Sequence, residues 1–173
     1  MKKLYAPWRT HYARGIASKP KNDTGAASDC VFCVQFQKSD DHENGILRRF
    51  THAVVMLNKY PYNAGHLMVL PLQHASTLPQ LTATTRQEII ELASHAQQIV
   101  ITALGAHGVN IGINSGKAAG AGIPAHLHVH VLPRFEGDTN FMPVLCDTKP
   151  ISVDLSVIYA QLKPAFDAIV LES

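Results

Sequence analysis

The stretch from His126 to Leu132, His-Leu-His-Val-His-Val-Leu, alternates strictly between imidazole and apolar side chains. Successive side chains of a β-strand point to opposite faces of a sheet, so the alternation predicts a strand over these seven residues. His126, His128 and His130 would then share one face, spaced about 7 Å apart by the rise of the strand. The apolar residues between them would face the hydrophobic core.

Three imidazoles on one face of a strand indicate a site, because buried imidazoles need hydrogen-bond partners and apolar side chains would pack better. Two kinds of site fit. One is a metal site, since imidazole is a common metal ligand. The other is a site for phosphate chemistry, in which one histidine is the nucleophile and its neighbours donate hydrogen bonds. An accidental, exposed histidine-rich strand is the third interpretation.

The loop ahead of this strand favours phosphate chemistry. Residues 115–125 read Ser-Gly-Lys-Ala-Ala-Gly-Ala-Gly-Ile-Pro-Ala and carry little side-chain bulk. A loop of this kind lets an anion approach backbone N–H groups. It is not a P-loop, because Lys117 is followed by Ala118 instead of Ser or Thr.

Apolar periodicity predicts the elements around the histidine strand. The runs at 53–57 and 66–70 predict a hairpin, joined by the Pro-, Asn- and Gly-containing turn at 59–65. Residues 109–114 alternate and predict a further strand. Hairpin strands combined with one long central helix and a C-terminal helix predict an α+β fold with an antiparallel sheet.

Residues 85–104 predict the long helix, because their apolar side chains fall on one helical face. Thr85 and Glu88 have the spacing of a capping box, which would satisfy exposed N–H groups at the helix start. Gly105 is well placed to end the helix. The C-terminal helix is expected to bend or break near Pro164.

The composition is that of an ordinary globular protein: 173 residues, 46% hydrophobic, 16% charged and a net charge of +2. We expect one domain, with an arm and linker over 1–29, a core over 30–143 and an extension over 144–173. Neither a membrane span nor a dedicated nucleic-acid surface is indicated. Three cysteines without a signal peptide predict no disulfide framework and a cytoplasmic location.

The pattern His-φ-His-φ-His-φ-φ, with φ apolar, is the signature of the histidine-triad (HIT) family of nucleotide hydrolases and transferases, which this chain resembles from about residue 30 to 134. The segment from Asn58 to Val69 looks like the family's first hairpin. The stretches 5–9, 119–124, 133–134 and 137–143 resemble the diadenosine tetraphosphate phosphorylase (ATP adenylyltransferase-like) branch.

The resemblance implies a HIT-like fold and an enzyme in which His128 attacks the α-phosphate of a dinucleoside polyphosphate. The product would be a covalent nucleotidyl-histidine, released by phosphate or water. His66 and His130 would stabilise charge on the phosphate oxygens. The resemblance further implies that Asn58 contacts the ribose and that Asn114 contacts phosphate or orders the loop.

One departure concerns Gly122 and Ile123, which stand near the places where hydrolase branches carry Gln and Ser or Thr. Backbone N–H groups of Gly120, Ala121 and Gly122 would have to replace those side-chain contacts, which favours a phosphorylase. Two alternatives stay open: hydrolysis of phosphoramidates or other AMP conjugates, and a non-catalytic protein that binds nucleotide or metal.

Cys30 and Cys33 have the Cys-x-x-Cys spacing that lets two thiolates bind one zinc ion, although a redox pair or two core residues also fit. Some HIT relatives combine such a pair with two histidines, which implies His74 and His126 as the remaining ligands here. The resemblance thus implies a closed structural zinc site without an organic cofactor. It also implies a homodimer formed through the helix and the sheet edge.

Overall fold

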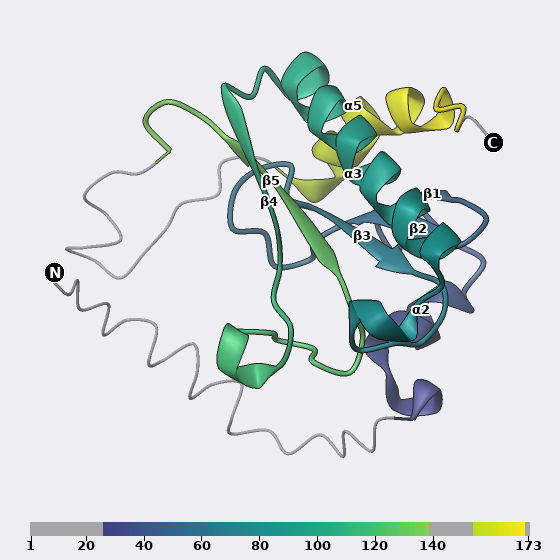
Figure 1. Cartoon of the computed structure of the whole chain (residues 1–173). Helices are drawn as coiled ribbons and strands as arrows, with labels where there is room; N and C mark the ends of the chain where they lie inside the picture. Colours follow the sequence, from purple (N-terminus) through teal and green to yellow (C-terminus); the bar gives the residue numbers. More distant parts are fainter. Residues whose placement is uncertain (1–25, 139–153, 172–173) are drawn as a thin grey trace, which may run out of the picture.

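The histidine strand lies inside a five-stranded antiparallel sheet, between two neighbours (Figure 1). The computed structural model of the chain describes residues 26–138 and 154–171. The stretch 5–9 and Cys146 lie outside the described residues. In spatial order the strands are β1 (Ile46–Arg49), β2 (Ala53–Leu57), β3 (Leu67–Pro71), β5 (Val129–Arg134) and β4 (Gly108–Ile113). The predicted α+β fold with an antiparallel sheet is confirmed.

The two central strands of the predicted hairpin, β2 and β3, are buried on both faces. Val55 and Val69 belong to the core cluster under the long helix, whereas Val54, Met56 and Met68 belong to a second cluster on the opposite face. Strands covered on both sides have no polar face, which explains their uninterrupted apolar runs.

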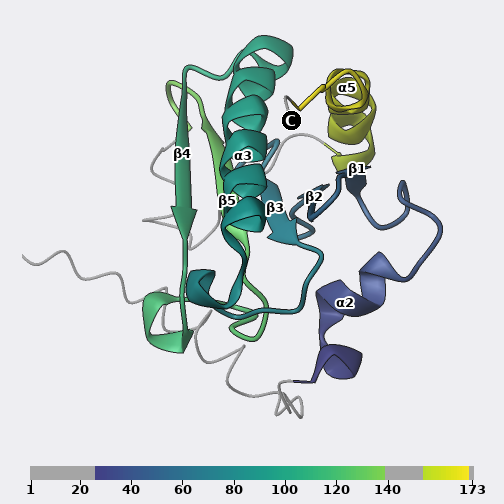
Figure 2. The same cartoon turned by 45° about the vertical axis from the view of Figure 1, so that its right-hand side comes forward.

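Two helices cover one face of the sheet (Figure 2). Helix α3 (Ala83–Leu104) lies across β3 and β5, and α5 (Leu155–Asp167) lies beside α3 against β1. The short helix α2 (Val31–Phe36) packs on the other face. The 3-10 turns are η1 (Ala27–Asp29), η2 (Leu78–Gln80) and η3 (Lys117–Ala119).

The histidine strand begins later than its sequence pattern predicts. Strand β5 starts at Val129, so that His126, Leu127 and His128 precede it. The N–H of Leu127 donates to the carbonyl oxygen of Ala75 at 2.7 Å instead of joining the sheet ladder. A contact with a distant loop therefore overrides the alternating pattern at this end.

The start of α3 also differs from the prediction. Thr82 is the N-cap, and its side chain accepts the N–H of Thr85 at 3.1 Å. The predicted capping box is wrong, because the carboxylate of Glu88 accepts the N–H groups of His52 at 2.7 Å and Ala53 at 2.9 Å. Glu88 thus fastens α3 to the start of β2. Gly105 ends the helix as predicted, with a φ of 67°.

The C-terminal helix α5 is not broken at Pro164 and continues to Asp167. The ring of Pro164 removes one backbone donor, but the N–H of Ala168 again donates to the carbonyl of Pro164 at 3.2 Å. Packing holds the helix together across this gap, since Tyr159 and Phe166 are buried against the sheet.

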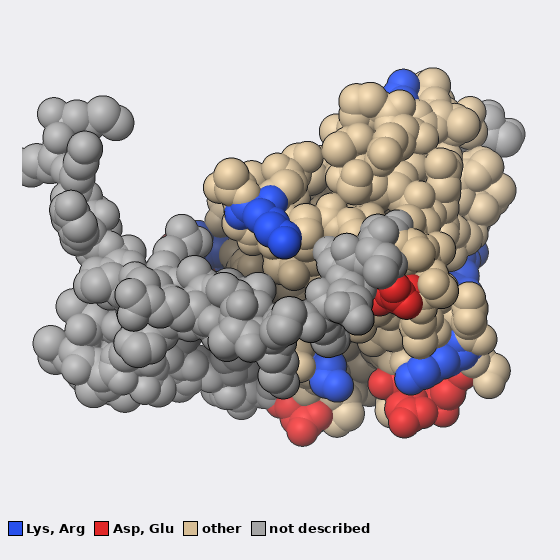
Figure 3. All heavy atoms as spheres, turned by 90° about the horizontal axis from the view of Figure 1, so that it is seen from below, with Lys and Arg blue, Asp and Glu red and all other residues tan. Residues whose placement is uncertain are grey.

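Charged side chains are sparse on the described part of the face in Figure 3. Lysine and arginine stand there in small separate groups within a largely uncharged surface. No helix among the described residues is long and apolar enough to span a membrane.

Candidate active site

Three of the predicted site histidines meet on the sheet face opposite α3. His130 lies on β5, paired with Met68 of β3 and with Gly112 of β4. The His66 ring, at the entry to β3, lies 5.0 Å from the His130 ring between centroids. The ring of His128 lies 4.8 Å from that of His130 on the other side. His66 and His128 are buried and His130 is half-buried.

The hydrogen bonds of His66 determine where its proton lies. The backbone N–H of Tyr62 donates to Nδ1 of His66 at 3.1 Å, so this nitrogen carries the lone pair. Neutral His66 is therefore protonated on Nε2, which lies 2.9 Å from Nδ1 of His130. Since Nδ1 of His130 accepts this bond, neutral His130 carries its own proton on Nε2. That nitrogen is buried and has no hydrogen-bond partner among the described residues.

His128 has the opposite arrangement. Its Nδ1 lies 2.8 Å from the carbonyl oxygen of His126 and must donate to it, because a carbonyl can only accept. The lone pair of neutral His128 is therefore on Nε2. The Phe32 ring packs against the His128 ring at 5.6 Å, and so limits its rotation.

Burial keeps this histidine group uncharged near neutral pH. Loss of hydration, together with the smaller effect of neighbouring imidazoles, lowers the pKa of His66 to about 3 and that of His130 to about 4. Burial also lowers the pKa of His128, and the hydrogen bond to the His126 carbonyl opposes this effect. A nucleophilic imidazole must be neutral, and the uncharged histidines meet this requirement at physiological pH.

The arrangement brings together the ring of His128, which has a lone pair on Nε2, and the ring of His130, whose Nε2–H has no partner in the described part of the chain. Buried donors are almost always paired, and one without a partner at such a site indicates a ligand that accepts its hydrogen bond. A tetrahedral anion can use both groups, with its central atom exposed to the lone pair and one oxygen to the donor.

Of the other predicted substrate contacts, Asn58 lies beside His66. Asn58 is half-buried; its Oδ1 accepts the N–H of Tyr60 at 2.9 Å, and its Nδ2 lies 3.4 Å from Nδ1 of His66. In the small-residue loop, the N–H groups of Gly120 and Ala121 donate within the same turn, at 3.0 and 3.3 Å. Gly122 is exposed, and Asn114 is half-buried at the end of β4.

The predicted metal ligands also come together. Cys30 caps α2, Cys33 lies within it, His74 follows β3 and His126 precedes β5. Their donor atoms all lie within 4.8 Å of one another. Nδ1 of His126 lies 3.3 Å from Sγ of Cys30, and Nδ1 of His74 lies 3.3 Å from Sγ of Cys33. Tetrahedral zinc with these ligands needs donor separations of roughly 3.3–3.8 Å, so the cluster fits zinc.

The surroundings of the cluster support this fit. Nε2 of His126 donates to the carbonyl of Pro71 at 2.9 Å, which leaves Nδ1 free to bind a metal. Burial lowers the pKa of His126 to about 4, so its imidazole is neutral. Burial and the neighbouring Cys30 raise the pKa of Cys33 to about 11. A metal cation bound by these four residues would stabilise the thiolate form of Cys33.

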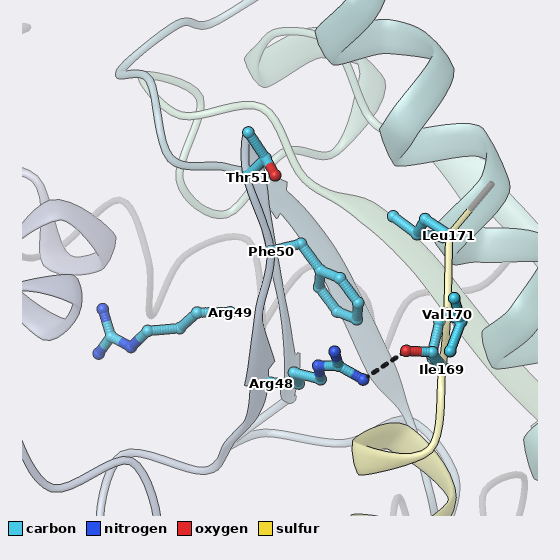
Figure 4. A pocket seen from close by; sticks show the side chains of 7 residues that line it. All are labelled: Arg48, Arg49, Phe50, Thr51, Ile169, Val170 and Leu171. Atoms are coloured by element: carbon cyan, nitrogen blue, oxygen red, sulfur yellow. Dashed lines mark hydrogen bonds between the residues drawn. The ribbon is translucent and has the colours of Figure 1, made fainter. Parts of the chain in front are cut away.

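A hollow lies elsewhere on the surface, between β1 and the residues after α5 (Figure 4). Nη1 of Arg48 donates there to the carbonyl of Ile169 at 2.7 Å, so its charge is engaged within the protein. This hollow is not the candidate active site, because none of the predicted site residues lines it. Its lining consists of Arg48, Arg49, Phe50, Thr51, Ile169, Val170 and Leu171.

Sequence reasoning missed two residues that orient the histidines. Tyr62 contributes its backbone N–H and stacks its ring 4.6 Å from that of His66. Phe32 contacts the rings of both His126 and His128. No motif marks Tyr62, and Phe32 is visible only as an apolar residue between the two cysteines.

Comparison with known proteins agrees with this geometry. The family model described as HIT domain matches residues 40–137. The AP-4-A phosphorylase of Mycobacterium tuberculosis is 33% identical over 151 residues, which cover 87% of this chain and 77% of that protein. The asymmetrical bis(5'-nucleosyl)-tetraphosphatase of Schizosaccharomyces pombe is 31% identical over 86 residues, or 50% of this chain and 47% of that protein.

The fold itself has close counterparts among solved structures. The crystal structure of a Zn-bound histidine triad family protein from Mycobacterium smegmatis aligns with a TM-score of 0.66 and 24% identity. The alignment covers 82% of this chain and 96% of that one. The sheet and its helices thus match those of a known histidine triad structure.

Proposed function

The chain belongs to the HIT domain family of nucleotide-processing enzymes, and on this premise we propose that it cleaves dinucleoside polyphosphates at the α-phosphate, with inorganic phosphate as the acceptor. One observation carries the proposal: the ring of His128, whose lone pair is on Nε2, lies 4.8 Å between centroids from the ring of His130, whose buried Nε2 has no partner among the described residues. The similarity to a phosphorylase over most of the chain supports the choice of acceptor.

The first step forms a bond between His128 Nε2 and the α-phosphorus while the bond from phosphorus to the departing polyphosphate oxygen breaks. The N–H of His130 Nε2 donates to a phosphate oxygen as negative charge develops there. In the second step an oxygen of inorganic phosphate attacks the same phosphorus, and the N–P bond breaks. Diadenosine tetraphosphate would yield ATP in the first step and ADP in the second, with His128 restored to its neutral form.

His66 has a supporting part in this scheme. Both its ring nitrogens are engaged within the protein, one by the N–H of Tyr62 and the other by Nδ1 of His130. His66 thus acts by holding the proton of His130 on Nε2, the nitrogen proposed to donate to the phosphate oxygen. The residues proposed to bind the substrate are Asn58 at the ribose, and Asn114, Gly120, Ala121 and Gly122 at the phosphates. Gly120 and Ala121 would contribute if their turn opens on binding.

We further propose that Cys30, Cys33, His74 and His126 hold a zinc ion. The ion would support the structure by joining α2 to the segments after β3 and before β5. The carbonyl of His126 accepts the Nδ1 proton of His128, so the ligand cluster adjoins the nucleophile without contacting substrate.

A homodimer and a cytoplasmic location stay predictions. Strand β4 is the last strand of the sheet, and its Ile111 is 43% exposed. An apolar side chain on an unpaired strand edge is compatible with a second copy at this edge. Light scattering of the purified protein tests the dimer.

Product analysis of diadenosine tetraphosphate, with and without inorganic phosphate, tests the proposed reaction. ADP and ATP that form only with phosphate are the expected result. AMP and ATP without phosphate would make the enzyme a hydrolase, and no turnover would favour AMP conjugates or a binding role. His128→Ala should abolish turnover and keep its circular dichroism spectrum; a variant with near-normal activity would refute the nucleophile.

A further inference from the structure

The loop between β2 and β3 is held by a buried side chain with no part in the reaction. Asn63, which is 8% exposed, donates from Nδ2 to the carbonyl of Pro133 at 3.1 Å and to Oδ2 of Asp138 at 2.7 Å. The backbone carbonyl of Asn63 accepts the N–H of His66 at 3.2 Å. Asn63 therefore connects the backbone of His66 to the end of β5 and the turn that follows.

The carboxylate of Asp138 is the centre of this connection. Its side chain is only 8% exposed, and Arg134 holds it through two bonds, Nε to Oδ2 at 2.7 Å and Nη2 to Oδ1 at 2.9 Å. The N–H of Phe135 also donates to Oδ2, at 3.2 Å. A nearly buried carboxylate is costly unless donors surround it, and here Arg134, Phe135 and Asn63 supply them.

The network extends across the sheet. Nη1 of Arg134 donates to Oδ1 of Asn110 on β4 at 2.9 Å. Gly65, with a φ of 78°, packs so closely on the end of α3 that a Cβ would collide with Leu104. The loop that carries Tyr62 and His66 is thereby fixed on two sides, by polar contacts and by close packing.

We propose that Asp138 is a positioning residue of the active site, acting through Asn63 on His66 and so on the donor N–H of His130. Arg134 holds the carboxylate of Asp138 in place through its two hydrogen bonds. For the part of His130 in turnover this inference rests on the proposed function. The position of the His66 proton, in contrast, follows from the contacts alone.

Asp138→Ala removes the acceptor of Asn63 and frees the loop. A displacement of catalytic groups by about 1 Å can lower rates by about 100-fold, and a partial release should lower kcat roughly tenfold with KM changed less than twofold. Asp138→Asn keeps an oxygen for the Asn63 amide and should restore part of kcat. Asp41→Ala is the matched control, because Asp41 forms a similar two-bond pair with Arg49 away from the histidines.

Asn63→Ala cuts the same connection at another point. If both residues act through one path, the double variant with Asp138→Ala should lose no more of kcat than the worse single variant. Losses of kcat that multiply, or an equal loss in Asp41→Ala, would overturn the proposal in favour of general destabilisation.

Nitrogen-15 NMR of the histidine rings supplies a measurement that needs no substrate. The wild-type protein should show His66 and His130 protonated on Nε2, and Asp138→Ala should show a mixture of the two tautomers. An unchanged single tautomer in that variant would refute the positioning role. If the wild-type protein turns over no nucleotide, the proposed function fails, but this spectrum still decides whether Asp138 orients the histidines.

Discussion

Acid should destabilise this protein through His66, because the folded chain holds that side chain neutral. Burial lowers its pKa from an ordinary value of 6.5 to about 3. Between these two values the unfolded chain binds a proton that the folded chain does not, so the free energy of unfolding falls as the pH decreases below 6.5 and levels off near 3. At pH 5 this proton uptake lowers the free energy of unfolding by about 2 kcal/mol, because each pH unit below 6.5 contributes about 1.36 kcal/mol.

Urea unfolding at pH 8 and pH 5 measures this effect. His66→Gln cannot titrate and can still donate a hydrogen bond to His130. Between pH 8 and pH 5 the free energy of unfolding of the wild-type protein should therefore fall by about 2 kcal/mol more than that of this variant. Comparing variants removes the contribution of other groups, including acid release of any metal. His95→Gln, on α3, should retain the wild-type response.

An equal loss of stability in wild type and His66→Gln would refute this reasoning. It would mean that His66 accepts a proton in the folded state at pH 5. The chain of hydrogen bonds that assigns the proton of His130 would then not hold at pH 5, since it requires Nδ1 of His66 to be unprotonated.

Three further changes test other parts of the structure. Cys33→Ser should lower the zinc content measured by atomic emission and reduce the melting temperature; unchanged metal content would argue against the site. Glu88→Ala leaves two backbone N–H groups at the start of β2 without their acceptor and should cost about 1–3 kcal/mol in urea unfolding, whereas exposed Glu91→Ala should change little. Gly65→Ala and Gly105→Ala both place alanine at a positive φ, but only at position 65 would the new Cβ collide with another side chain, that of Leu104. The melting temperature of Gly65→Ala should therefore fall further.

Local pattern was sufficient for the hairpin and for most of the long helix. The apolar run at 53–57 coincides with β2, and the αL glycine at 105 ends α3 where expected. Both depend on interactions within a few residues, which the sequence displays directly. Strand β1 was not predicted, because its four residues include Arg48 and Arg49, whose side chains bind carbonyls of α2 and α5.

The histidine motif and its flanking segments were sufficient to predict the family, which the comparisons show. The choice of His128 as the nucleophile, which that resemblance implies, stays a prediction. Only the tertiary structure decided which nitrogen of the His130 ring carries a proton, because that depends on His66, 64 positions away along the chain. It also decided that β5 starts after the first two histidines and that Asp138 reaches the site through Asn63. The contact between Asn63 and Asp138 joins residues 75 positions apart. Hydrogen bonds of this kind form only when folding brings their partners together, so no local pattern records them.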